Sequence, residues 1–190
     1  MDAAAAYPHA WCRQAHTRDG TPYFIRPIRP DDAERERRFI AGLSPDSLHN
    51  RFLGGLREPS PAFIHRLVDV DYDRTMAFVA VVGEGDDERI IGVARYAANP
   101  SSSDCEFAVT VADEWQSRGI GTTLARLLFD YARARGFRRT YGYILAGNDR
   151  MVSLARWIGL QVRAAPDDAT LLEASMPLQT PPVNPPAAAR

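Results

Sequence analysis

The hydrophobic positions form short runs between residues 21 and 177, and most of these runs have the length of a β-strand. Consecutive runs at 76–82, 90–96 and 105–111 are separated by turn segments rich in Gly, Asp, Asn, Pro and Ser. Short turns between neighbouring strands predict an antiparallel meander. Further strands are predicted at residues 21–27, 140–145, 160–164 and 170–176, the last two forming a hairpin.

Residues 119–135 instead repeat their apolar positions every three or four residues, which predicts an amphipathic helix ended by Gly136. Ser44-Pro45 and Ser60-Pro61 are typical of helix starts, because serine caps the helix and proline fits its first turn. A short helix is predicted at 151–157. Helices flanking a largely antiparallel sheet indicate an α+β, or mixed αβ, fold.

One more helix is predicted after residue 30, with Asp31 as its cap and Glu34 three residues further on. The charged run at 34–38 is expected to be a solvent-exposed helix face. Residues 1–20 and the Pro/Ala-rich residues 178–190 are expected to be tails around a single domain at 21–177.

The composition excludes several classes of protein. The formal net charge is −1, and no nucleic-acid-binding motif is present. Two distant cysteines and four scattered histidines predict neither disulfides nor a metal site, and no lysine occurs. With no signal peptide and no apolar stretch near the ~20 residues of a membrane span, a cytoplasmic protein without membrane contact is expected.

The segment most indicative of ligand binding runs from Gln116 to Thr122, between the strand at 105–111 and the long helix. Gly119 and Gly121 let backbone N–H groups approach a ligand, and the first N–H groups of a helix attract anions. Arg118 adds a cation there. A dinucleotide fingerprint needs a glycine where Leu124 stands, and a P-loop needs a lysine. Two glycines alone also fit an ordinary strand-to-helix turn.

This Gln-x-x-Gly-x-Gly loop, with Asn148 and the later Gly159-Leu160, resembles the GNAT superfamily of N-acetyltransferases over residues 21–177. Within it, the chain is most similar to the acyltransferase domain of bacterial protein-lysine acetyltransferases, through residues 25–32, 43–47, 51–52, 106–109 and 145–151.

The resemblance implies a mostly antiparallel, splayed central sheet flanked by helices, with acetyl-CoA in the gap. The pantetheine arm would pair with the strand backbone at Val109 and Val111, and Asn148 would lie in a second cofactor segment. The diphosphate would be held by Gln116, Ser117, Arg118, Gly119, Ile120, Gly121 and Thr122.

Acetyl transfer needs a neutral amine, and the resemblance implies that Glu106 is the general base. Strand alternation places Glu106 on the opposite face from Cys105, whose apolar surroundings predict an inert thiol. Alternatively, Glu106 is a solvated strand residue. The superfamily often has a tyrosine that reprotonates the departing CoA thiolate, and Ala155 stands at that position here. The proton donor could therefore be Tyr141, Tyr143, a water molecule, or no group at all.

The expected activity is acetyl transfer from acetyl-CoA to a primary amine, with a lysine on another protein as the preferred acceptor. A small-molecule amine acetyltransferase and a non-catalytic acyl-CoA sensor module are the alternatives. A polycationic amine would need an acidic cleft, for which Asp69, Asp71 and Asp73 are the only dense acidic run.

Overall fold

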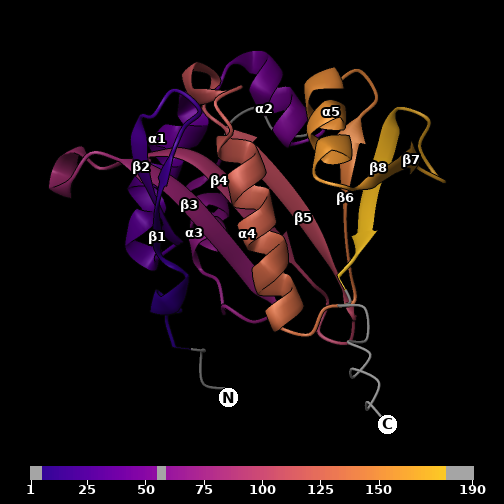
Figure 1. Cartoon of the computed structure of the whole chain (residues 1–190), viewed down its shortest axis with the longest axis horizontal. Coiled ribbons are helices and arrows are strands. Elements are labelled where there is room, and N and C mark those ends of the chain that lie inside the picture. Colours follow the sequence, from indigo (N-terminus) through magenta and orange to yellow (C-terminus); the bar gives the residue numbers. More distant parts are fainter. Residues whose placement is uncertain (1–5, 55–58, 179–190) are drawn as a thin grey trace, which may run out of the picture.

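The computed structural model describes residues 6–54 and 59–178 and contains one eight-stranded sheet. The strand order is β1-β2-β3-β4-β5-β6-β8-β7, and every neighbouring pair is antiparallel except β5 and β6 (Figure 1). The strands are β1 Arg13–His16, β2 Pro22–Pro27, β3 Thr75–Val82, β4 Arg89–Ala97, β5 Asp104–Val111, β6 Arg139–Leu145, β7 Gln161–Ala164 and β8 Leu171–Pro177. The predicted mixed αβ class and the meander β3-β4-β5 are confirmed.

Helices cover both faces of this sheet. The long helix α4 crosses one face, and α1 and α3 pack on the other (Figure 1). The strand β3 is therefore buried on both sides, which explains its unbroken apolar sequence. The α-helices are α1 Ala33–Ala41, α2 Pro45–Arg51, α3 Pro61–Val68, α4 Ile120–Ala134 and α5 Asp149–Trp157, and short 3-10 turns are η1 His9–Trp11, η2 Pro30–Asp32, η3 Gly85–Asp87 and η4 Asp113–Trp115.

The sheet splits between β5 and β6. Their parallel pairing begins at Asp104 and Arg139 and ends at Glu106 and Tyr141, after which β5 stays with β4 and β6 stays with β8. At the point of divergence, a Cβ placed on Gly142 would lie 2.6 Å from the carbonyl oxygen of Phe107. A glycine is therefore what allows the two backbones to approach so closely before they separate.

The expected N-terminal tail is wrong for residues 9–16. η1 and β1 lie in this stretch, and β1 pairs with β2 at the edge of the sheet. Trp11 anchors the segment, because its ring lies 4.9 Å from that of Tyr131 and 6.3 Å from that of Phe78, between centroids. At the other end, Leu178 is fully buried, and residues 1–5 and 179–190 of the two expected tails lie outside the described residues.

Two expectations about the first helix are also wrong. Its N-cap is Asp32 rather than Asp31, and the Asp32 carboxylate accepts two hydrogen bonds from Arg26 at 2.6 and 2.7 Å. Glu36 is buried rather than solvated and pairs with Arg95 of β4 at 2.7 Å. In both cases an arginine on a buried strand requires a partner of opposite charge.

The serine caps are confirmed. Ser44 Oγ accepts the Ser47 N–H at the start of α2, and Ser60 Oγ accepts the Phe63 N–H at the start of α3, each at 3.2 Å. Among the helices that the structure describes, none is long and apolar enough to cross a bilayer.

Candidate active site

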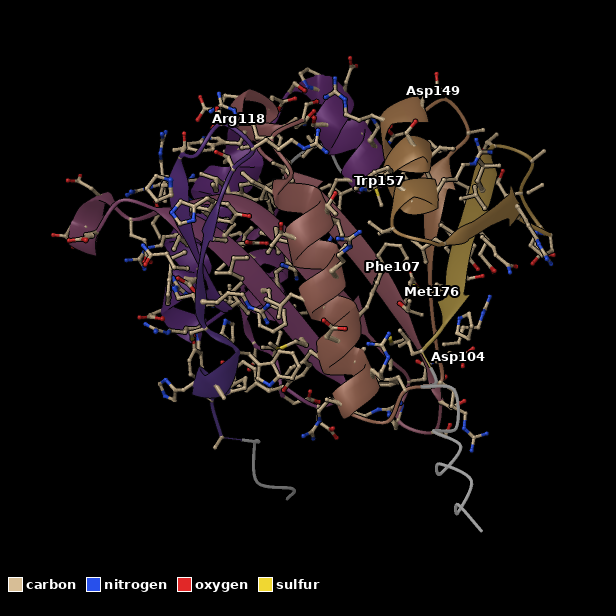
Figure 2. The ribbon with its side chains drawn as sticks, in the orientation of Figure 1. Asp104, Phe107, Arg118, Asp149, Trp157 and Met176 are labelled. Atoms are coloured by element: carbon tan, nitrogen blue, oxygen red, sulfur yellow. The ribbon has the colours of Figure 1, made fainter. Side chains whose placement is uncertain are left out.

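A cavity of about 280 Å³ opens where β5 and β6 diverge. Residues 107–111 of β5 and 142–144 of β6 line two of its sides. Residues of the loop at 116–122, of α2, of α5 with its N-cap Asn148, and Arg18 of the β1–β2 turn supply the rest. In Figure 2, Phe107 lies beside the middle of α4, whereas Arg118 and Asp149, at the start of α5, lie on either side of the upper end of α4. The cavity thus runs from the point where the strands part to the N-terminal end of α4.

The loop before α4 exposes a row of backbone donors. Ser117 and Gly119 have φ angles of +62° and +94°, which turn successive N–H groups toward the same side. Within the described part of the chain, no backbone N–H from Ser117 to Thr122 donates to a protein acceptor. Free N–H groups at the positive end of a helix dipole match the oxygens of a diphosphate. The residues present therefore fit the diphosphate of coenzyme A.

The side chain of Gln116 joins three elements at this loop. Its Nε2 donates to the Val111 carbonyl at 3.0 Å and to Ser47 Oγ of α2 at 3.1 Å. Its Oε1 accepts a hydrogen bond from Arg150 of α5. Gln116 therefore joins β5, α2 and α5, three of the elements that line the cavity.

Most of the residues expected to contact the cofactor line the cavity: Val109, Val111, Gln116, Ser117, Gly119, Gly121, Thr122 and Asn148. The Oδ1 of Asn148 caps α5 by accepting the Met151 N–H at 3.1 Å. Two expected residues turn away. The Ile120 side chain is fully buried in the core, and Arg118 stacks over Trp115 and pairs with Asp19 at 3.6 Å.

Sequence reasoning missed several residues that line the cavity. Asn50 and Arg51 come from the end of α2, and Arg18 comes from the turn between β1 and β2. Arg51 and Phe52 belong to the segments that carry the family resemblance, but no local sequence pattern indicates that Arg51 lines a cavity. The turn at Arg18 lay in the expected tail, and only the fold brings it to α4.

Glu106 is the last β5 residue paired with β6, so it stands at the apex of the split. Partial burial raises the pKa of its carboxyl group, and the nearby Arg51 opposes this shift. Burial lowers the pKa of Arg51 to about 10, with Arg95 acting in the same direction, while Glu36 and Glu106 oppose the change. The Glu106 side chain is exposed and is not among the residues that line the cavity, but it directly precedes Phe107, which is. A carboxylate with a raised pKa at this position has the chemistry of a general base.

Two tyrosines of β6 flank this position. Tyr143 lines the cavity, and its ring lies edge-on to that of Tyr141 at 6.0 Å between centroids. Burial, followed by the charge of Glu106, raises the pKa of Tyr141. By contrast, Ala155 is fully buried inside α5, and burial raises the pKa of the Cys105 thiol to about 11. The expectation that Cys105 is inert is consistent with that shift.

Residues 46–160 match the family model described as the Acetyltransferase (GNAT) family. The chain belongs to this family. The GNAT chain is 46% identical over 152 residues to an acetyltransferase of Pseudomonas aeruginosa, covering 80% of this chain and 82% of that protein. It is 32% identical over 143 residues to the acetyltransferase Pat of Mycolicibacterium smegmatis, covering 75% of this chain but only 42% of that protein.

The fold of this GNAT chain is similar to the crystal structure of the GNAT domain of S. lividans PAT. The TM-score is 0.82 at 26% identity, covering 90% of this chain and 99% of that domain. A cAMP-binding acyltransferase from Mycobacterium smegmatis matches with a TM-score of 0.61 at 25% identity, and the match covers 49% of that chain. The chain is therefore an acyltransferase, and its family generally uses acetyl-CoA as the acyl donor.

Proposed function

We propose that this chain transfers an acetyl group from acetyl-CoA to a primary amine, with the lysine ε-amine of another protein as the preferred acceptor. The observation that carries the proposal is the layout of one cavity. Free backbone donors of the loop lie at one end, and Phe107 lines the cavity where β5 and β6 separate, directly after Glu106 in β5. A donor molecule held by its diphosphate at the loop could extend along β5 toward that carboxylate.

Bound acetyl-CoA would supply an activated acetyl thioester, and residues of the protein would remove the proton from the acceptor amine. A lysine amine has a pKa of about 10.4, so only about 1 in 2,500 is neutral at pH 7. Deprotonating the amine at that pH therefore costs roughly 4.6 kcal/mol of free energy. A positioned base typically contributes ~10²–10⁴ in rate. Glu106 would take the amine proton, and its raised pKa makes it a stronger base at neutral pH.

Charges around the cavity favour an acceptor with a single amine. Among the described lining residues, the charged ones are Arg18, Arg51 and Arg150, and none is acidic. Two residues of the acidic run considered for a polycation, Asp71 and Asp73, have partners of their own. Asp71 accepts bonds from its own turn, including the Thr75 N–H at 2.7 Å, and Asp73 binds Arg135 at 2.9 Å beyond the far end of α4. A polyamine or aminoglycoside would meet repulsion at this site.

The similarity to Pat of Mycolicibacterium smegmatis and to S. lividans PAT supports the assignment to the same group of acetyltransferases. For the departing thiolate, Tyr143 is the proposed proton donor, since its side chain lines the cavity. The alternative of a non-catalytic acyl-CoA sensor drew support from Ala155, but that residue lies in the core, away from the cavity. The sensor reading therefore loses its main argument.

The test is incubation of the purified protein with labelled acetyl-CoA and a lysate of the source cell, followed by separation of proteins from small molecules. Label on proteins, lost with Glu106→Gln, is the expected result. Label confined to small molecules would exclude the lysine acceptor while leaving acetyl transfer in place. Absence of any released free thiol with all acceptors would favour the sensor module.

A further inference from the structure

The turn between β1 and β2 is docked against the loop that precedes α4. The Arg18 N–H donates to the Arg118 carbonyl at 3.0 Å. Asp19 Oδ1 accepts bonds from the Thr21 hydroxyl at 3.0 Å and from the Thr17 hydroxyl, while Asp19 Oδ2 pairs with Arg118 at 3.6 Å. The turn is thus held in shape and joined to the loop by the same carboxylate.

This docking directs the Arg18 side chain along the exposed donors. A Cβ placed on Gly119 would lie 3.6 Å from Arg18 Cγ and 3.8 Å from Arg18 Nε, and Arg18 lines the cavity. Within the described part of the chain, its guanidinium has no carboxylate partner, unlike that of Arg118, which Asp19 neutralises. Among the described ion pairs none involves the cavity arginines Arg18, Arg51 or Arg150, and Arg18 is the one that lies against Gly119 of the loop.

We infer that Arg18 binds a phosphate of the CoA donor, so that the β1–β2 turn is part of the cofactor site. The inference rests on the proposed function, because it takes the loop as the diphosphate site. A guanidinium beside free N–H groups and a helix N-terminus forms a convergent set of donors for phosphate oxygens. The ligand offers two such groups, the diphosphate and the ribose 3′-phosphate, and the chemistry of recognition is the same for both.

The experiment measures Kd by calorimetry for CoA, for 3′-dephospho-CoA and for pantetheine, which lacks every phosphate. Three proteins are compared: the parent, Arg18→Gln, and the control Arg13→Gln, which removes an exposed arginine from β1 outside the cavity. Thermal unfolding of each protein checks that the turn remains folded.

Arg18→Gln is expected to bind CoA about tenfold more weakly. This loss of affinity is at the low end for a charge-assisted hydrogen bond, because Arg18 is exposed to water. Pantetheine binding should not change, and the parent's CoA affinity should fall more steeply with salt than the variant's. An equal loss for dephospho-CoA assigns Arg18 to the diphosphate, and a loss for CoA alone assigns it to the 3′-phosphate. Either pattern supports the inference.

Unchanged CoA affinity in Arg18→Gln, or an equal loss in Arg13→Gln, would overturn the role of Arg18 and leave the loop as the cofactor site. A parent protein that binds neither CoA nor dephospho-CoA would instead remove the proposed function, and the inference with it. The two failures are distinguished by the parent alone, before any variant is considered.

Discussion

Replacing Gly142 with alanine tests whether close backbone contact controls the split in the sheet. The new Cβ would lie 2.6 Å from the Phe107 carbonyl oxygen and 3.0 Å from Cε1 of its ring. The ring can move, but the carbonyl belongs to the backbone of β5, which is paired with β4 over residues 106–111. β5 and β6 would therefore have to separate at the apex of the cavity.

Forcing an extra methyl group into a packed site costs typically about 1–3 kcal/mol. For a domain of this size each kcal/mol corresponds to roughly 2–4 °C, so the Tm of Gly142→Ala should fall by about 2–12 °C. Activity should fall further, since a displacement of about 1 Å at a reacting site can cost up to about 10²-fold. We expect kcat/KM to drop by at least about tenfold.

Gly121→Ala is the matched control. A Cβ at Gly121 meets only side chains, Leu154 Cδ2 at 3.4 Å and Val111 Cγ2 at 3.5 Å, which are ordinary contacts. Because alanine is favoured over glycine in a helix by roughly 0.5–1 kcal/mol, this variant should keep or gain stability. Both proteins are compared by thermal unfolding, and Gly142→Ala is compared with the parent by steady-state kinetics, because Gly121 itself lines the cavity. If Gly142→Ala unfolds at the parent's Tm with full activity, the tight approach of β6 to Phe107 is not what forms the apex.

Three further predictions concern the cavity. Gly121→Val should abolish CoA binding in calorimetry, because its branched side chain exceeds the room that alanine fills between Val111 and Leu154; binding as tight as the parent's would place the diphosphate elsewhere. Glu106→Gln should keep cofactor affinity but lower kcat/KM at neutral pH, with the loss shrinking as pH approaches the amine's pKa of about 10.4; an unchanged neutral rate would remove Glu106 from the mechanism. Arg51→Gln should raise the pKa of Glu106 and move the acidic limb of the kcat/KM profile to higher pH, since only the carboxylate acts as base; a limb that stays in place would show that Arg51 does not act on Glu106.

The parts of the fold that were predicted correctly depend on short-range signals. Proline next to serine specified the starts of α2 and α3, and both serines make the expected cap bonds. Alternation along β5 correctly assigned Cys105 and Phe107 to the core face beneath α4. These patterns succeed because the residues involved are neighbours in sequence as well as in space.

The missed features depend on contacts between distant segments. β1 is a short edge strand with exposed side chains, so it carries no alternation, and the ring of Trp11 against Tyr131 holds its segment in place. Glu36 has the sequence surroundings of a solvated residue, and only the position of Arg95 on β4 explains its burial. Arg18 escaped notice for the same reason, because the turn that carries it contacts a loop a hundred residues later in the chain.

The segment that leads into the loop before α4 is also fastened to α2. Asp113 accepts the Ser44 N–H at 2.9 Å and the Ser47 hydroxyl at 2.7 Å, and Gln116 donates to that same Ser47 hydroxyl. The start of α2 is thereby fastened to the segment that leads into the loop, and α2 ends at Arg51, the arginine whose charge acts on Glu106. The loop before α4 and Glu106 are therefore connected through α2, by hydrogen bonds at its start and by the charge of Arg51 at its end. A change in this loop on cofactor binding would reach the base through α2, whereas a loop that stayed rigid would keep both in fixed geometry for reaction.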